Sequence, residues 1–135
     1  MEKIFSRIKN EILGKNYELS IAYVSLKKSQ ELNKKWRGKN KPTNVLSFAL
    51  SKNSGELVLC KAVIKKELKK FNRTFPELLG FLVIHGLLHL KGLDHSSTME
   101  EAEKKYDQKY FSRDRRRIVH DASRGRRISK RRKKS

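Results

Sequence analysis

One stretch of this 135-residue chain is apolar on every side of a helix, and two histidines stand within it. It covers residues 78–90 and reads LLGFLVIHGLLHL. Thr74 and Glu77 precede it at the spacing of a capping box, and Pro76 suits a first helical turn, so a helix is expected to begin here. A helix without a polar face belongs in the core, where other elements cover it. The rest of the chain is therefore expected to form a domain around this segment.

The remaining elements follow from the spacing of apolar residues. Apolar residues three or four positions apart predict helices, and alternating or continuous apolar residues predict strands. We expect helices over 4–13, 29–36, 64–71 and 99–111, and strands over 19–26, 45–50 and 57–59. Asn53, Ser54 and Gly55 form a turn between the last two strands, which favours a hairpin. Gly80 and Gly86 predict close packing against the central helix.

The positive charge of the chain is large, and half of it lies at one end. The sequence has 34 Lys and Arg against 14 Asp and Glu, a formal net charge of +20. Residues 113–135 hold 12 of the basic residues and two of the acidic ones, with too few apolar side chains for a core. We therefore expect a folded domain over 1–112 and a disordered basic tail over 113–135. The charge predicts an anionic partner, such as nucleic acid, a ribosome-like particle or an anionic membrane surface.

The sequence lacks the usual features of a secreted or integral membrane protein. Its single cysteine, Cys60, allows no internal disulfide and fits a reducing compartment. No stretch reaches the roughly 18–20 apolar residues of a membrane span. Residues 1–10 lack the apolar run of a signal peptide. We expect a cytoplasmic protein with Cys60 in its core.

The spacing of the histidines predicts a metal site. His85 and His89 are four residues apart, so both imidazoles lie on one helical face. Gly92 can end the helix in the left-handed conformation, and His95 follows the turn. A single histidine on an apolar face is usually a hydrogen-bonded core residue, but this pair is followed by a third. Three neutral imidazoles leave a fourth position open, which is typical of catalytic zinc, and we expect one zinc ion per chain.

A class of zinc proteases shares this spacing except for one essential residue. In the motif H-E-x-x-H-x-x-G-x-x-H, the histidines and the glycine stand where this chain has His85, His89, His95 and Gly92. Gly86 stands in place of the glutamate that deprotonates the metal-bound water in those enzymes. This difference argues for a substrate other than a peptide.

Two motifs are similar to those of a known family. Residues 85–95, HGLLHLKGLDH, resemble the H-G-x-L-H-L-x-G-x-D-H signature of the YbeY family of endoribonucleases, the bacterial rRNA maturation factors. Residues 32–48, LNKKWRGKNKPTNVLSF, resemble the family's L-N-x-x-x-R-x-x-x-x-P-T-[DN]-V-L-S-F. A weaker third stretch covers residues 55–60, with Glu56 where the family usually has aspartate. The resemblance covers about residues 17–112 and leaves out the basic tail.

The resemblance implies both a fold and an activity. The fold is α+β, a small mixed β-sheet packed with helices, with a zincin-like three-histidine metal site between them. The activity is that of a zinc-dependent, single-strand-specific endoribonuclease. This activity belongs to processing of the 3′ end of the small-subunit rRNA and to ribosome maturation and quality control. The implied partners are rRNA and the small ribosomal subunit, without a membrane. By the family's motifs the metal ligands are His85, His89 and His95, and the functionally important arginine is Arg37.

The segment around Arg37 is basic and suits a phosphate-bearing substrate. The guanidinium group of Arg37 is a planar fork of donors that fits phosphate oxygens. Lys39 and Lys41 either contact the RNA backbone or belong to an ordinary surface loop. Trp36 stacks on a base or packs beneath this loop, and we favour packing. Asp94 either caps a turn or holds a ligand imidazole.

Two other functions fit parts of the sequence. One is a different metallohydrolase, such as a peptidase, and Gly86 and the net charge argue against it. The other is a ribosome-assembly factor without enzymatic activity, in which the metal is structural and the basic surface holds rRNA. Binding and cleavage need the same charges, so the sequence leaves this second alternative open.

Overall fold

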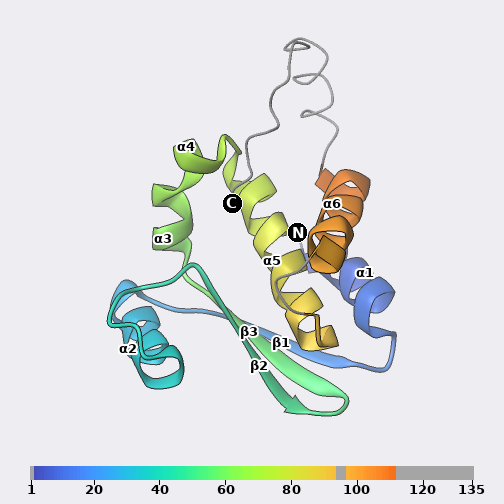
Figure 1. Cartoon of the computed structure of the whole chain (residues 1–135), viewed down its shortest axis with the longest axis horizontal. Coiled ribbons are helices and arrows are strands. Elements are labelled where there is room, and N and C mark those ends of the chain that lie inside the picture. The colour runs from blue at the N-terminus through green and yellow to red at the C-terminus, as the bar shows by residue number, and fades with distance from the viewer. Residues whose placement is uncertain (1, 94–96, 112–135) are drawn as a thin grey trace.

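The structure, a computed structural model, describes residues 2–93 and 97–111, which form a three-stranded sheet and six helices (Figure 1). The elements follow in the order α1 (Glu2–Leu13), β1 (Glu18–Tyr23), α2 (Leu26–Arg37), β2 (Val45–Ser51), β3 (Ser54–Leu59), α3 (Lys61–Lys66), α4 (Leu68–Phe71), α5 (Phe75–Lys91) and α6 (Ser97–Phe111). This order confirms the α+β class. The predicted basic tail over 113–135 lies outside the described residues.

β3 is the central strand of the sheet. β1 pairs with it in parallel and β2 pairs with it antiparallel, which confirms both the mixed sheet and the predicted hairpin. Because β1 and β3 run in the same direction, their carboxyl ends lie at the same edge of the sheet. α2 and α3 both follow from that edge (Figure 1). Cys60, the residue after β3, is 1% exposed and belongs to the core as expected.

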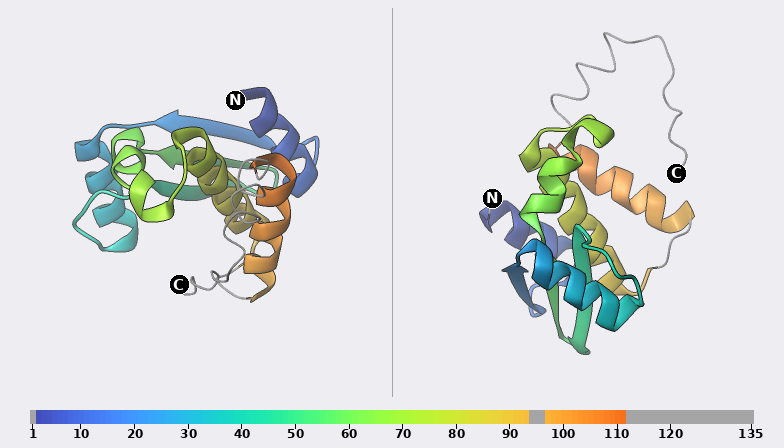
Figure 2. Two further views of the ribbon diagram at one scale, coloured as in Figure 1. Left: turned by 90° about the horizontal axis from the view of Figure 1, so that it is seen from above. Right: turned by 90° about the vertical axis from the view of Figure 1, so that its left-hand side faces the viewer.

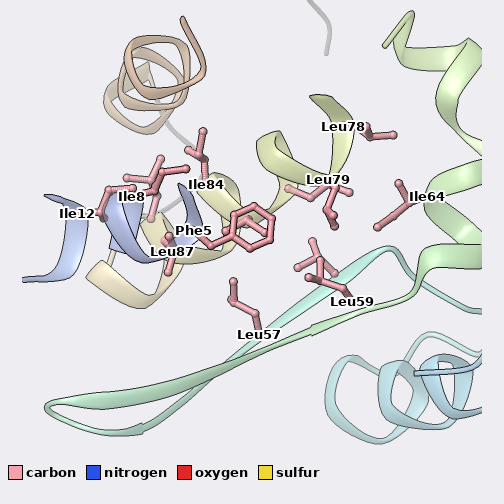
Figure 3. Close-up of a cluster of buried hydrophobic side chains, with 14 of the residues drawn as sticks. Phe5, Ile8, Ile12, Leu57, Leu59, Ile64, Leu78, Leu79, Ile84 and Leu87 are labelled. Atoms are coloured by element: carbon pink, nitrogen blue, oxygen red, sulfur yellow. The ribbon is translucent and has the colours of Figure 1, made fainter. Parts of the chain in front are cut away.

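α5 runs through the middle of the molecule, as its sequence predicts (Figure 1). The capping box of Thr74 and Glu77 forms in full at its start, and Gly92 ends it in the left-handed conformation with a φ of 105°. Its apolar side chains meet those of α1, β3 and α3 in one core (Figure 3). The labelled core residues are Phe5, Ile8, Ile12, Leu57, Leu59, Ile64, Leu78, Leu79, Ile84 and Leu87. Neither α5 nor any other described helix is long and apolar enough to cross a membrane.

Two glycines allow neighbouring elements to approach α5 closely. A β-carbon on Gly86 would lie 2.6 Å from Leu57 Cδ2 and 3.1 Å from Ser47 Oγ. Ser47 Oγ also donates a hydrogen bond of 3.2 Å to the carbonyl oxygen of Gly86. A β-carbon on Gly80 would overlap the ring of Phe111. The predicted close packing is confirmed, and a glutamate at position 86 would have to enter the space that the sheet occupies.

Two of the predicted helices differ from those in the structure. α2 begins at Leu26 rather than at Ser29, because the side chain of Ser25 caps it by accepting a hydrogen bond from the backbone N–H of Lys28. The single helix predicted over 64–71 is two short helices, α3 and α4. They are separated at Glu67, whose φ of −98° and ψ of 2° depart from helical geometry.

Candidate active site

His85 and His89 lie on the same face of α5, toward its carboxyl end. Their Nε2 atoms are 3.1 Å apart, and the ring planes make an angle of 80°. Two nitrogens that each lie about 2.0–2.1 Å from a tetrahedral zinc ion are roughly 3.3–3.4 Å apart. The separation of the two Nε2 atoms is therefore close to the one that a shared metal ion requires.

Glu103 of α6 fixes the orientation of His85. Its Oε2 atom lies 2.5 Å from His85 Nδ1, and the two side chains are 14% and 23% exposed, respectively. In the neutral tautomer in which Nδ1 donates to this carboxylate, Nε2 keeps the lone pair that a metal ion binds. A carboxylate behind a ligand histidine is a common arrangement at metal centres, where it sets the tautomer and the ring orientation.

The sequence analysis missed Glu103, although its position carries a signal. Glu103 lies four residues after the buried Met99 and three before the half-buried Tyr106, on the inner face of α6. Glu100 and Glu101 lie on the exposed face of the same helix. A carboxylate on the apolar face of a helix needs a polar partner, and here that partner is His85.

The third predicted ligand, His95, lies outside the described residues, as do Asp94 and His120. Among residues 2–93 and 97–111, no group of three His, Cys, Asp or Glu side chains is placed to hold a metal ion. The structure thus brings together two of the three predicted ligands, and the complete three-histidine site stays a prediction.

Arg37 is the last residue of α2, and its side chain is exposed. Gly38 ends the helix in the left-handed conformation with a φ of 72°. Lys39 and Lys41 are exposed on the loop that follows. Within the described part of the chain, no hydrogen bond or ion pair engages the guanidinium group of Arg37 or joins it to the histidines. This segment therefore presents three unpaired basic groups to an anionic ligand.

Two buried polar side chains of α2 hold this loop in place. Ser29 Oγ donates to the carbonyl oxygen of Thr43 over 2.8 Å and accepts from the backbone N–H of Thr43 over 2.9 Å. Asn33 Nδ2 donates to the carbonyl oxygen of Lys41 over 2.8 Å. Ser29 and Asn33 are only 2% and 1% exposed. The sequence analysis missed both, and two polar residues four positions apart on a buried helical face are the signal that could have indicated them.

β2 lies between the Arg37 loop and the histidine helix. Ser47 faces α5, where it bonds the carbonyl group of the residue after His85. Phe48 faces the other side, and its ring meets the ring of Trp36 edge-on, with 5.8 Å between the centroids. The ring of Trp36 is 59% exposed, so the packing beneath the loop that we expected is wrong. In the left view of Figure 2, the end of α2 and the beginning of α6 project from the same side of the sheet.

Comparison with known proteins assigns the family. A family model described as Endoribonuclease YbeY matches residues 1–114. The chain belongs to the YbeY family. The resemblance predicted from the two motifs is thereby confirmed. Members of this family are endoribonucleases, so the chain is a nuclease, a hydrolase that acts on phosphodiester bonds of RNA.

Individual YbeY relatives are moderately similar over most of the domain. Endoribonuclease YbeY of Thermotoga maritima is 37% identical over 113 residues, which cover 78% of this chain and 74% of the relative. The Staphylococcus carnosus protein of the same name is 35% identical over 107 residues, 70% of each chain. The solution structure of TM1509 from Thermotoga maritima superposes with a TM-score of 0.61 at 32% identity, covering 93% of this chain and 89% of that one.

Proposed function

We propose that this YbeY-family chain is a zinc-dependent, single-strand-specific endoribonuclease that processes rRNA. The observation that carries the proposal is the convergence of His85 Nε2 and His89 Nε2, with Glu103 behind one of them. His95 would supply the third nitrogen. We further propose that the substrate is the 3′ end of the small-subunit rRNA, and that the protein acts on the ribosomal subunit in the cytoplasm. The net charge of +20 supports a large anionic partner of this kind.

The residues of the chain have separate tasks in this reaction. A zinc ion held by three imidazoles would supply a water molecule of lowered pKa and a positive charge beside the phosphate. Glu103 would keep His85 in the tautomer and orientation that the metal needs. Arg37 would hold phosphate oxygens with its planar donors while negative charge develops on them. Lys39 and Lys41 would contact the RNA backbone on either side.

The proposal is tested with metal-analysed, full-length protein and RNA oligonucleotides of one length. We expect cleavage of single-stranded RNA, weak cleavage of the matched duplex, and loss of cleavage after chelation that zinc restores. A single-stranded oligonucleotide with the small-subunit rRNA 3′ sequence would show whether cutting occurs there. Protein that contains zinc but leaves every RNA intact would contradict the endonuclease and favour an assembly factor.

Glu103→Gln weakens zinc binding by about tenfold to a hundredfold, the usual effect of removing a carboxylate behind a ligand histidine. Glutamine has the same shape but lacks the charge that stabilises the Nδ1 proton of His85. Titration of zinc against a competing chelator measures the change. Glu101→Gln, which removes an exposed charge from the same helix, is the matched control and keeps the affinity. Equal affinities in the two variants would reduce Glu103 to a packing residue.

Arg37→Lys lowers the rate of RNA cleavage by about tenfold to a hundredfold while zinc content and thermal stability stay unchanged. Lysine keeps the charge but loses the planar pair of donors, and a hydrogen bond to a charged group contributes roughly 1.5–3 kcal/mol. Single-turnover cleavage at saturating RNA measures the rate. Lys52→Arg, at an exposed position outside α2, controls for a change of basic side chain. An Arg37→Lys protein with full activity would make Arg37 an ordinary surface charge.

Truncation after Phe111 weakens RNA binding and flattens its dependence on salt. Residues 113–135 carry 12 Lys and Arg against two Asp. On single-stranded RNA, the log–log slope falls by about 0.7 for each phosphate that the tail no longer neutralises. Anisotropy titrations at several salt concentrations measure the slope, and cleavage at saturating RNA stays nearly intact. Equal slopes for both chains would show that the tail does not touch RNA, and loss of zinc or of folding would show that the domain extends beyond residue 111.

A further inference from the structure

Lysines gather on one side of the molecule, on α2, α3 and α4. The right view of Figure 2 looks onto this side, where the three helices face the viewer. Residues 26–41 hold seven Lys and Arg against one Glu, and residues 61–71 hold five Lys against one Glu. α6, by contrast, holds three Lys against four Asp and Glu. The positive charge of the described residues is therefore concentrated on this side.

The stability of the fold does not explain all of these lysines. The first turn of α2 contains Lys27 and Lys28 and no acidic residue. A helix dipole favours acidic side chains at this end and disfavours basic ones. Glu67, which lies between α3 and α4 and is the single acidic residue of 61–71, accepts a hydrogen bond of 2.9 Å from Asn44 Nδ2 in a partly buried position. Lys27 and Lys28 thus cost stability, as expected where a surface binds an anion, whereas the lysines in the last turns of α2, α3 and α4 are favoured by the dipole.

Exposed aromatic rings share this side with the lysines. The described residues expose five large apolar side chains: Tyr23, Leu26, Trp36, Leu50 and Phe71. Of these, only Leu50 belongs to the far end of the sheet, beside the β2–β3 turn. Each of the three rings has a lysine Nζ near its centroid, at 4.4 Å for Tyr23, 5.2 Å for Trp36 and 5.5 Å for Phe71. Stacking surfaces and positive charges are therefore presented together.

We propose that this lysine–aromatic face, made of Tyr23, Trp36, Phe71 and the lysines of α2, α3 and α4, is a docking platform for single-stranded RNA. The inference rests on the proposed RNA substrate and adds a binding surface outside the histidine site. Unpaired bases stack on the exposed rings while the lysines neutralise phosphates, the combination that binds single strands without reading sequence. An acidic protein would explain the lysines but not the rings. Because Trp36 precedes Arg37, a base stacked on it would bring its phosphates beside the Arg37 loop.

Trp36 is the only tryptophan of the chain, so its fluorescence reports on the platform without a label. We titrate the full-length His89→Ala protein, in which the RNA stays intact, with a twelve-nucleotide oligouridylate. Stacking should quench the fluorescence, and the quenching should saturate at the affinity measured by anisotropy. A duplex RNA of equal length, whose bases are already stacked, and polyglutamate, which has no bases, should cause little quenching. The proposal would be overturned if polyglutamate bound as tightly as RNA and RNA caused no quenching. That result would favour an acidic protein partner.

Matched variants test whether RNA binding depends on this face or only on the net positive charge of the chain. Replacing Lys61, Lys65 and Lys69 with Gln should reduce the log–log salt slope by about 2, at roughly 0.7 per neutralised phosphate. The control replaces three exposed lysines outside the face, Lys3, Lys15 and Lys52, with Gln and removes the same charge. Trp36→Ala should weaken binding by about fivefold to a hundredfold, the range for one base stacked on an aromatic ring. Leu50→Ala, also an exposed apolar truncation, should change nothing.

The outcomes distinguish this inference from the proposed function. If the wild-type protein cleaves single-stranded RNA but the lysine and Trp36 variants bind like their controls, the platform is wrong and the function stands. If RNA binds and quenches Trp36 but the wild-type protein cleaves nothing, the platform stands and the endonuclease is wrong. Thermal melts of each variant confirm that a loss of binding is not a loss of folding.

Discussion

His89→Ala protein contains no zinc after purification and cleaves RNA at least about a thousandfold more slowly than the wild type. The metal contributes several kcal/mol to phosphate chemistry, and each 1.36 kcal/mol is a factor of ten in rate. The substituted side chain is only half-buried on α5, and alanine has a high helix propensity, so the fold should persist. Elemental analysis, circular dichroism and a single-stranded RNA cleavage assay measure the three properties.

The control for this variant is His120→Ala, which removes a histidine outside the predicted ligand set. It should keep both the metal content and the cleavage rate. A His89→Ala protein that still matured rRNA would contradict the enzymatic proposal and favour the assembly factor. A His89→Ala protein that kept its zinc would contradict the ligand set.

Asp107→Asn destabilises the domain by about 3–5 kcal/mol, the cost of leaving one partner of a buried ion pair without its counter-charge. Arg73 bonds Asp107 through two contacts of 3.0 and 3.1 Å, with side-chain exposures of 14% and 5%. The guanidinium group of Arg73 also lies over the ring of Phe81, 4.6 Å from its centroid. The pair joins α6 to the segment before α5, and urea unfolding at neutral pH measures its loss.

Two further variants make this prediction specific. Glu11→Gln removes the partner of Lys109 at an exposed position and should have a much smaller effect, because water screens surface ion pairs. Arg73→Met combined with Asp107→Leu removes both buried charges and should recover most of the stability that the single variant loses. An Asp107→Asn protein as stable as the wild type would show that water reaches the Arg73–Asp107 pair.

The central helix and the histidine pair could be predicted because both depend on short-range spacing. The capping box of Thr74 and Glu77, the apolar run and the left-handed Gly92 all act within one element. The spacing of His85 and His89 already places both imidazoles on one face. These features form the centre of the fold, so the sequence predicted the core and the convergence of His85 and His89 with few errors.

The remaining details depend on contacts between distant segments. Glu103 reaches His85 only because α6 packs against α5. Ser25 and Ser29 are both suitable helix caps, and the choice depends on contacts: Ser25 caps α2, while Ser29 bonds the loop after α2 from inside the helix. The break at Glu67 accompanies its bond to Asn44, 23 positions earlier. Periodicity contains no information about such partners.

The parallel pairing of β1 with β3 also determines the order in which the sheet can assemble. β2 and β3 are adjacent in the chain, so their hairpin closes a short loop and can form within microseconds. β1 needs a crossover connection, because its partner β3 follows α2 and β2 in the chain. During synthesis, β1 therefore emerges first and waits for β3, with Leu19 and Ile21 uncovered. In that interval β1 is an unpaired strand that is open to pairing with another chain.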